Sequence, residues 1–295
     1  MLSTNVCKLK LRNPTILASG ILGSTGASLK RVARHGAGAV VTKSIGKTPR
    51  EGHKNPTIIE LGDCLINAIG LANPGYKAFV EEIKIARQGN IPVIASVFGR
   101  SIEEYVEVAK GLQDYADAIE LNLSCPNIEG KLFAQDAELS YEVVREVRKE
   151  ISKPVIAKLT ASVADIVEIA KACEEAKASG ITAINTIKAM KIDINFRKPI
   201  LANKTGGLSG RCIKPIALRC VYEIASEVSI DIIGCGGIAS GEDALEFLMA
   251  GAKAIEIGTG VYLHGLSIFK KVCKEIEKYL RKHDLSLQDI IGSAL

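Results

Sequence analysis

The chain has 295 residues, of which 47% are hydrophobic and 24% charged, values typical of a globular protein with a substantial core. Its net charge of +5 is spread along the chain, and it lacks the clustered basic patch of nucleic-acid-binding proteins. No signal peptide or long apolar span is visible, so we expect a cytoplasmic protein that does not bind membranes.

The eight cysteines include no CxxC pair, so the usual spacing of zinc-ribbon and iron–sulfur sites is missing and we expect no metal site. In a cytoplasm the thiols are expected to be reduced. Most of them are then interpreted as small core residues.

Apolar, β-branched segments recur along the chain and predict strands. These segments are residues 15–20, 39–44, 93–99, 118–125, 155–160, 183–187, 230–238 and 254–260. Helical patterns separate most of them, as at 102–115 and 163–180. Continuous apolar strands that alternate with helices indicate a parallel sheet covered on both faces. We therefore predict an α/β fold, a closed (β/α)8 TIM barrel formed by one domain over residues 1–295, with an open doubly wound sheet as the alternative.

Three segments fall outside the alternation of strands and helices. Residues 2–13 are interpreted as short extended segments that cap the bottom of the barrel. Residues 45–75 and 188–212 are long and non-periodic, and they follow the second and sixth predicted strands. Long irregular segments in a compact domain are usually functional, so we expect them to be loops over the top of the barrel.

Each predicted strand ends in residues that a hydrophobic core would not select. They are Ser19-Gly20, Lys43-Ser44, Ser96 with Gly99, the segment from Asn122 to Asn127, Lys158, Asn185-Thr186, Gly234 to Gly237, and Gly258-Thr259-Gly260. A β/α barrel has its active site at the carboxyl ends of its strands. These residues therefore predict a ligand site in the mouth of the barrel.

Glycine clusters follow the seventh and eighth predicted strands, as GCGG (234–237) and GTG (258–260). Barrels bind phosphate at this place through backbone N–H groups, and glycine lets the backbone approach an anion closely. Each cluster alone is equally compatible with a tight turn. The two together favour a phosphorylated ligand.

Lys43 and Lys158 each lie in an apolar strand. Such a lysine can extend from a strand end into solvent, face an anionic ligand, or form a Schiff base with a carbonyl substrate. Their proximity to Asn122 and Asn185 favours a planar heterocycle, because amides both donate and accept hydrogen bonds. Cys125 has polar neighbours and is a candidate nucleophile or general base, but no histidine pattern supports a protease-like Cys–His pair.

Several segments, in the same order along the chain, resemble the class 1 dihydroorotate dehydrogenases, and the 1B subgroup most closely. They are INAIGLANPG (66–75), ELNLSCPN (120–127), AKL (157–159), INT (184–186), KPILANKTGGLSG (198–210), GCGGI (234–238) and EFLMAGA (246–252). The resemblance implies an FMN-binding barrel that oxidises (S)-dihydroorotate to orotate in de novo pyrimidine biosynthesis. It also implies a homodimer or heterotetramer with an electron-transfer subunit, which carries FAD and a 2Fe–2S cluster and uses NAD as acceptor.

By position, Cys125 matches the catalytic base of this family, which takes the proton at C5 while hydride passes from C6 to flavin N5. The positions that match the substrate site are Lys43, Asn67, Ala68, Ile69, Gly70, Leu71, Asn122, Asn127, Asn185 and Thr186. Those that match the flavin site are Ser19, Lys43, Ser44, Ser96, Asn122, Lys158, Ile184, Gly210, Gly236, Gly237, Gly258 and Thr259. Lys158 matches a lysine near the N1–C2 edge of the flavin, and residues 126–138 match a loop expected to cover the site.

The chain departs from the family pattern at Ser96, where asparagine is usual, at Cys235, where methionine is common, and in a shorter loop after Asn127. Because these changes concern the mouth and the covering loop, three alternatives stay open. They are a flavin barrel that acts on another dihydropyrimidine such as dihydrouracil, a non-catalytic flavin-binding barrel, and a lyase that uses Lys158 as a Schiff base.

Overall fold

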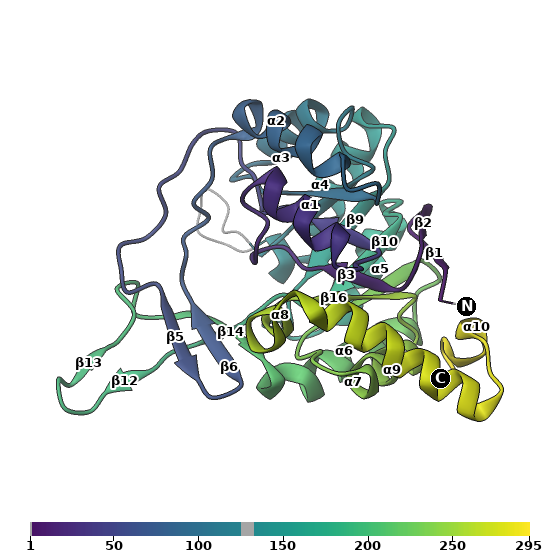
Figure 1. Cartoon of the computed structure of the whole chain (residues 1–295). Coiled ribbons are helices and arrows are strands. Elements are labelled where there is room, and N and C mark those ends of the chain that lie inside the picture. Colours follow the sequence, from purple (N-terminus) through teal and green to yellow (C-terminus); the bar gives the residue numbers. More distant parts are fainter. Residues whose placement is uncertain (1, 125–132) are drawn as a thin grey trace.

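The computed structural model describes residues 2–124 and 133–295, and its central feature is a closed barrel of eight parallel strands (Figure 1). In chain order around the barrel, the strands are β3 (Thr15–Leu17), β4 (Ala39–Val41), β7 (Val93–Val97), β8 (Ala118–Asn122), β9 (Val155–Leu159), β10 (Gly180–Ala183), β15 (Asp231–Cys235) and β16 (Ala254–Ile257). Closure through the pairing of β16 with β3 confirms the predicted β/α barrel and excludes the open doubly wound sheet.

The sixth strand differs from its predicted position. The sequence predicts residues 183–187, whereas β10 runs from Gly180 to Ala183. Gly180 pairs with Ile156 on one side and with Asp231 on the other, which fixes the register of the strand. The apolar pattern alone does not distinguish these positions, because it continues through the segment that follows the strand.

Helices cover the outside of the barrel (Figure 1). They are α1 (Gly26–Arg34), α2 (Tyr76–Arg87), α3 (Ile102–Leu112), α4 (Ala137–Glu150), α5 (Ile166–Glu175), α6 (Lys214–Ala225), α7 (Gly241–Met249), α8 (Thr259–His264), α9 (Ile268–His283) and α10 (Leu287–Ile290), with short 3-10 turns η1 (Phe133–Gln135), η2 (Arg211–Ile213) and η3 (Gly265–Ser267). Helix α3 shows why such a segment forms a helix and packs on the barrel. The Ser101 side chain caps it by accepting a hydrogen bond from the backbone N–H of Glu104, and Tyr105, Val108 and Leu112 form its buried face.

The bottom of the barrel is closed by the N-terminal hairpin of β1 (Thr4–Val6) and β2 (Leu9–Leu11), as the sequence predicts. Leu11 belongs to the same buried apolar cluster as Ala118 and Ala254, which lie at the start of β8 and β16. The hairpin is fastened by the Cys7 backbone N–H, which donates a 2.6 Å hydrogen bond to Asp231 Oδ2. The lower barrel is therefore an apolar, sealed interior.

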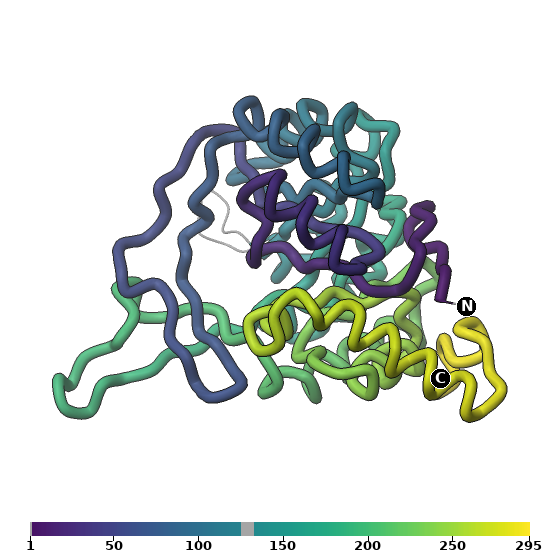
Figure 2. Tube along the Cα trace, viewed as in Figure 1, coloured from purple at the N-terminus to yellow at the C-terminus, as the bar shows by residue number. Residues whose placement is uncertain are grey.

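The two long segments predicted as irregular loops form a four-stranded antiparallel sheet instead. Its order is β11 (Ile187–Ala189), β14 (Gly206–Gly210), β6 (Cys64–Asn67) and β5 (Ile58–Leu61), and a small hairpin of β12 (Ile192–Asp193) and β13 (Lys198–Pro199) extends from it. Figures 1 and 2 show these elements on the side of the molecule away from both termini. Their regular pairing connects the segments after the second and sixth barrel strands.

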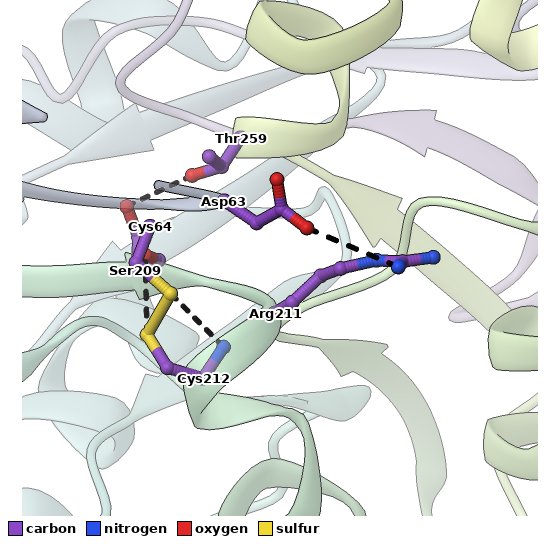
Figure 3. The surroundings of a disulfide bond; sticks show 6 residues. All are labelled: Asp63, Cys64, Ser209, Arg211, Cys212 and Thr259. Atoms are coloured by element: carbon purple, nitrogen blue, oxygen red, sulfur yellow. Dashed lines mark hydrogen bonds and ion pairs between the residues drawn. A yellow bond between two sulfur atoms is a disulfide. The ribbon is translucent and has the colours of Figure 1, made fainter. Parts of the chain in front are cut away.

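One expectation about the cysteines is wrong. Cys64 and Cys212 form a disulfide, drawn in Figure 3, whereas the sequence predicts reduced thiols. The pairing of β6 with β14 explains it, because Gly210 lies opposite Cys64 and thereby brings the Cα atoms of the two cysteines to 6.3 Å. Cys173 and Cys220 are buried free cysteines, as the core interpretation predicts.

No helix in residues 2–124 and 133–295 is long and apolar enough to cross a membrane. In the same residues no group of three or more His, Cys, Asp and Glu side chains is arranged to hold a metal ion.

Candidate active site

The interior of the barrel changes from apolar to polar towards the carboxyl ends of the strands. Side chains two residues apart in a strand point to the same face, so Ala118 is followed on the inside of β8 by Glu120, and Ala254 on the inside of β16 by Glu256. Lys158 of β9 lies in this layer too, and it is only 3% exposed. A charged layer therefore separates the sealed apolar bottom from the mouth.

Lys158 is held by two carboxylates. Its Nζ lies 2.6 Å from Glu256 Oε2 and 3.6 Å from Glu120 Oε1, and it donates a 3.4 Å hydrogen bond to Ser19 Oγ. Burial disfavours the charge of Lys158, but the attraction of Glu120 and Glu256 outweighs it and raises the pKa of the lysine. Lys158 is thus a buried ammonium group, and because a Schiff base needs a neutral amine, the lyase alternative is disfavoured.

The sequence interpretation missed both glutamates. A signal was present, because Glu120 and Glu256 each interrupt a short apolar strand two residues after an inward-facing alanine. Burial, together with the charge of Glu120, raises the pKa of Glu256 to about 8.

Four of the predicted residues join in one hydrogen-bond network above this charged layer. Asn185 donates from Nδ2 to Asn122 Oδ1 at 3.1 Å, and Asn122 donates from its own Nδ2 to Ser44 Oγ at 3.0 Å. The Ser44 and Ser96 hydroxyls are 3.0 Å apart. Tyr105 supports the network from outside the barrel by donating its hydroxyl proton to the Asn122 carbonyl at 2.7 Å. The network fixes the amide orientations at the ends of β8 and β10.

Lys43 follows β4 and is half-buried. Burial lowers its pKa, and its amine has no hydrogen-bond or ion-pair partner among residues 2–124 and 133–295. A half-buried ammonium without a partner is costly unless an anion binds it. Lys43 is therefore a cation at the mouth that is available to an anionic ligand, in contrast to Lys158.

Three of the predicted glycines lie together, one at the end of β14 and two directly after β15. Gly210, Gly236 and Gly237 have φ angles of 101°, 136° and 76°. A Cβ on Gly237 would lie 2.6 Å from Lys214 Cβ and 3.0 Å from the Gly210 carbonyl oxygen, so side chains are excluded here on both conformational and steric grounds. This arrangement leaves a cradle of backbone next to the start of α6, suited to a phosphate.

Gly258 and Thr259 adjoin this cradle. Thr259 donates from Oγ1 to Ser209 Oγ at 2.8 Å (Figure 3). Ser209 precedes Gly210 in the chain. A Cβ on Gly258 would lie 3.6 Å from Ala18 Cβ, beside Ser19. The ends of β3, β15 and β16 thus meet at one corner of the mouth, and the predicted phosphate-side residues are brought together.

Asn67 connects the outer sheet to the mouth. Its Nδ2 donates a 3.3 Å hydrogen bond to the carbonyl of Gly207, whose Cα faces the Thr186 side chain so closely that no Cβ would fit. Thr186 in turn donates its backbone N–H to Asn185 Oδ1 at 2.8 Å. Asn67, Thr186 and Asn185 are therefore consecutive along one edge of the site.

The chain after Asn67 follows a fixed path back to the barrel. Ala68 donates its N–H to the Thr57 carbonyl at 2.7 Å, and Gly70 and Leu71 have left-handed φ angles of 76° and 56°. The buried Asn73 side chain then accepts a 3.2 Å hydrogen bond from the Gly46 N–H, two residues beyond Ser44. Among the hydrogen bonds of residues 2–124 and 133–295, none directly joins the segment 68–71 to the amide network.

The remaining predicted residues are placed as follows. Ile184 is buried and donates its N–H to the Cys235 carbonyl at 2.8 Å. Cys125 and Asn127 lie outside the described residues. Of the predicted covering loop at 126–138, the described part begins at Phe133.

Comparisons with known proteins agree with one another. The family model described as dihydroorotate dehydrogenase matches residues 1–280. Three relatives are each called "Dihydroorotate dehydrogenase B (NAD(+)), catalytic subunit". The relative from Methanocaldococcus jannaschii is 50% identical and covers 100% of this chain and 98% of its own. The relative from Pyrococcus abyssi is 51% identical with 100% and 99% covered, and that from Thermoplasma acidophilum is 48% identical with 100% and 99% covered.

Proposed function

Because this chain belongs to the dihydroorotate dehydrogenase family, we propose that the mouth of its barrel is where dihydroorotate is oxidised to orotate in pyrimidine biosynthesis. The observation that carries this conclusion is the match of the family model to residues 1–280. The chain is therefore an oxidoreductase that acts on a carbon–carbon single bond.

The family implies a flavin, and we propose that this flavin is FMN. The described residues fit a flavin phosphate, because Gly210, Gly236 and Gly237 leave a cradle of backbone that a side chain would fill. Thr259 and Ser19 lie at the same corner. When bound, FMN supplies the hydride acceptor that no side chain can replace.

The ring of the flavin is proposed to lie above Lys158, within reach of Ser44, Ser96 and Asn122. The buried ammonium group of Lys158 places a positive charge at the base of the site, where it favours electron density on a bound ring. The hydroxyls and amides are already fixed by their mutual hydrogen bonds, so they lose little freedom when a ring binds. Ile184 contributes apolar surface.

The substrate is proposed to lie between the amide edge and Lys43. The half-buried ammonium group of Lys43 would pair with the carboxylate that dihydroorotate carries at C6. The ring amides of a pyrimidine both donate and accept, as do the side chains available at this edge. The proposed substrate contacts are Asn67, Ala68, Ile69, Gly70, Leu71, Asn122, Asn127, Asn185 and Thr186.

Cys125 is proposed as the general base. In this reaction the C5 proton would go to the Cys125 sulfur, the C5–H electron pair would form the C5=C6 double bond, and the hydride from C6 would be taken up by the bound flavin. The support is that Cys125 follows Asn122 closely in the chain, and that Asn122 ends a barrel strand at the mouth. A thiol with an ordinary pKa near 8.5 can act as a base at neutral pH when its surroundings lower that value.

The relatives are named catalytic subunits of an NAD⁺-dependent enzyme. We propose that this chain likewise works with a second subunit that carries FAD and a 2Fe–2S cluster, which passes the electrons on to NAD⁺, and that the assembly is a homodimer or heterotetramer. Native mass spectrometry of the complex from its own cells tests this. Recovery of the chain alone with full NAD⁺-linked activity contradicts it.

Orotate formation with an artificial electron acceptor tests the proposed activity directly. The wild-type chain is expected to convert dihydroorotate, and Cys125→Ala is expected to lose roughly 10²-fold or more of kcat. Dihydrouracil serves as the competing substrate, since it lacks the carboxylate that Lys43 would bind. Preference for dihydrouracil would favour the alternative dihydropyrimidine activity, and equal rates of wild type and Cys125→Ala would exclude Cys125 as the base.

A further inference from the structure

The proposed reaction leaves one group of buried charges unexplained. Inside the barrel, Lys158 contributes one positive charge, and Glu120 and Glu256 would contribute two negative charges if both were ionised. The two glutamates are 0% and 1% exposed. A net negative charge in a buried interior is costly, because burial removes the hydration of a carboxylate, and among the described residues Lys158 is the one cation paired with these two glutamates.

The hydrogen bonds within this group are incomplete for two ionised carboxylates. The Thr182 hydroxyl lies 3.2 Å from Glu120 Oε2 and 3.5 Å from Glu256 Oε1. It has one proton and can donate to only one of them, while its lone pairs can accept from the other. Glu120 Oε1 is buried without a hydrogen-bond partner among the described residues, although it faces Lys158 at 3.6 Å. One additional proton would let one carboxyl group donate to the Thr182 hydroxyl while that hydroxyl donates to the other carboxyl group.

We propose that Glu120 and Glu256 share one proton, and that this pair positions Lys158 and keeps the buried charge group neutral beneath the flavin. Both glutamates are positioning residues, since they act through Lys158. The part of the inference that concerns the flavin rests on the proposed function. The shared proton itself belongs to the chain and needs no ligand.

The neutral state has a consequence for the cofactor. A reduced flavin ring carries more negative charge than an oxidised one, and a fully ionised group of net charge −1 below it would oppose reduction. With the shared proton the group has no net charge, and the ammonium of Lys158 stabilises the reduced ring. Release of the proton at high pH would then make the flavin harder to reduce.

Other titratable groups face this pair. Cys235 of β15 is half-buried beside Lys158, and loss of hydration raises the pKa of its thiol to about 12, so it stays neutral. Cys7, in the N-terminal hairpin, also has a raised pKa, chiefly through burial. Lys158 stays protonated. Glu256, whose pKa is raised to about 8 chiefly by burial, is therefore a group of this layer that changes charge near neutral pH.

Infrared spectroscopy of the apoprotein tests the shared proton without any flavin. The spectrum of the wild type near pH 7 is expected to contain the carbonyl band of a protonated carboxyl group. The spectra of Glu256→Gln and of Glu120→Gln are expected to lack this band. Glu150→Gln is the matched control, because Glu150 is an exposed partner of Lys110 far from the interior. Absence of the band in the wild type, or its survival in either interior variant, would overturn the proposal.

The flavin potential provides the second readout. At a fixed potential and about pH 9, the ratio of reduced to oxidised flavin is expected to be on the order of tenfold higher in Glu256→Gln than in the wild type. The reason is that the glutamine side chain cannot become ionised. At about pH 6 the two proteins are expected to agree. If the ratio of reduced to oxidised flavin differs between the two proteins by the same factor at both pH values, the shared proton does not control the charge beneath the flavin. Failure to bind flavin would refute the proposed function, while the infrared result would still decide the shared proton.

Discussion

The Lys158 ammonium lies 2.6 Å from Glu256 Oε2, and the two residues belong to β9 and β16, which are not neighbours in the barrel. The contact therefore crosses the interior. Positions that other strands fill with apolar side chains are occupied here by charges at the base of the ligand site. Such an interior depends on protonation, and its stability is expected to vary with pH.

The first prediction concerns the free energy of unfolding. The pKa of Glu256 is raised from 4.5 to about 8 by burial and by Glu120, so between these pH values the folded chain holds a proton that the unfolded chain releases. This contribution is fully present below about pH 4.5 and is lost as the pH rises to about 8, with a slope of at most about 1.4 kcal/mol per pH unit.

Urea unfolding at a series of pH values measures this effect. The wild type and Glu150→Gln are expected to lose stability through the window, and Glu256→Gln is expected to lose less. Parallel curves for all three proteins would show that Glu256 has no raised pKa.

Lys43→Met is expected to lower kcat/KM for dihydroorotate by roughly 100-fold, because it removes the half-buried cation proposed to bind the substrate carboxylate. Lys47→Met is the matched control, since Lys47 is an exposed lysine paired with Glu107 at 2.8 Å. Steady-state kinetics of both variants decide the question. If both variants lose the same activity, Lys43 has no special role in binding.

Gly237→Ala is expected to reduce the flavin content of the purified protein strongly. The new Cβ would lie 2.6 Å from Lys214 Cβ, at a φ of 76°. Gly265→Ala shares a positive φ of 63° but has no atom within 4 Å of its new Cβ, and so controls for backbone strain alone. Equal flavin content in the two variants would show that Gly237 is not part of the site that binds the flavin phosphate.

The disulfide predicts a dependence on reductant. Cys64 and Cys212 are 148 residues apart in the chain, and closing so long a loop typically stabilises a protein by about 2–4 kcal/mol. Peptide mapping without reductant is expected to find the linked pair, and reduction, like Cys64→Ser, is expected to lower the melting temperature. The disulfide would be contradicted if peptide mapping found both thiols free and if reductant left the melting temperature unchanged.

Much of the barrel was predictable because each strand is a short apolar run between amphipathic helices. The polar residues at the strand ends were predictable too, because a hydrophobic core would not select residues such as Asn122 and Asn185. Their contact through a 3.1 Å hydrogen bond follows from barrel closure, which brings the ends of separate strands to one mouth.

The parts that were not predicted depend on pairing between distant segments. The outer sheet forms only when β6 meets β14, and this same register brings Cys64 to Cys212. Glu120 and Glu256 were overlooked because each appears as a single charge in an apolar strand. Only the closed barrel shows that both point inward at Lys158.

An anaerobic absorption spectrum of the flavin-loaded chain, recorded before and after addition of dihydroorotate, tests whether this chain oxidises dihydroorotate. We expect the oxidised flavin bands to bleach with dihydroorotate and to persist with dihydrouracil. Flavin that stays oxidised with dihydroorotate would contradict the proposed reaction.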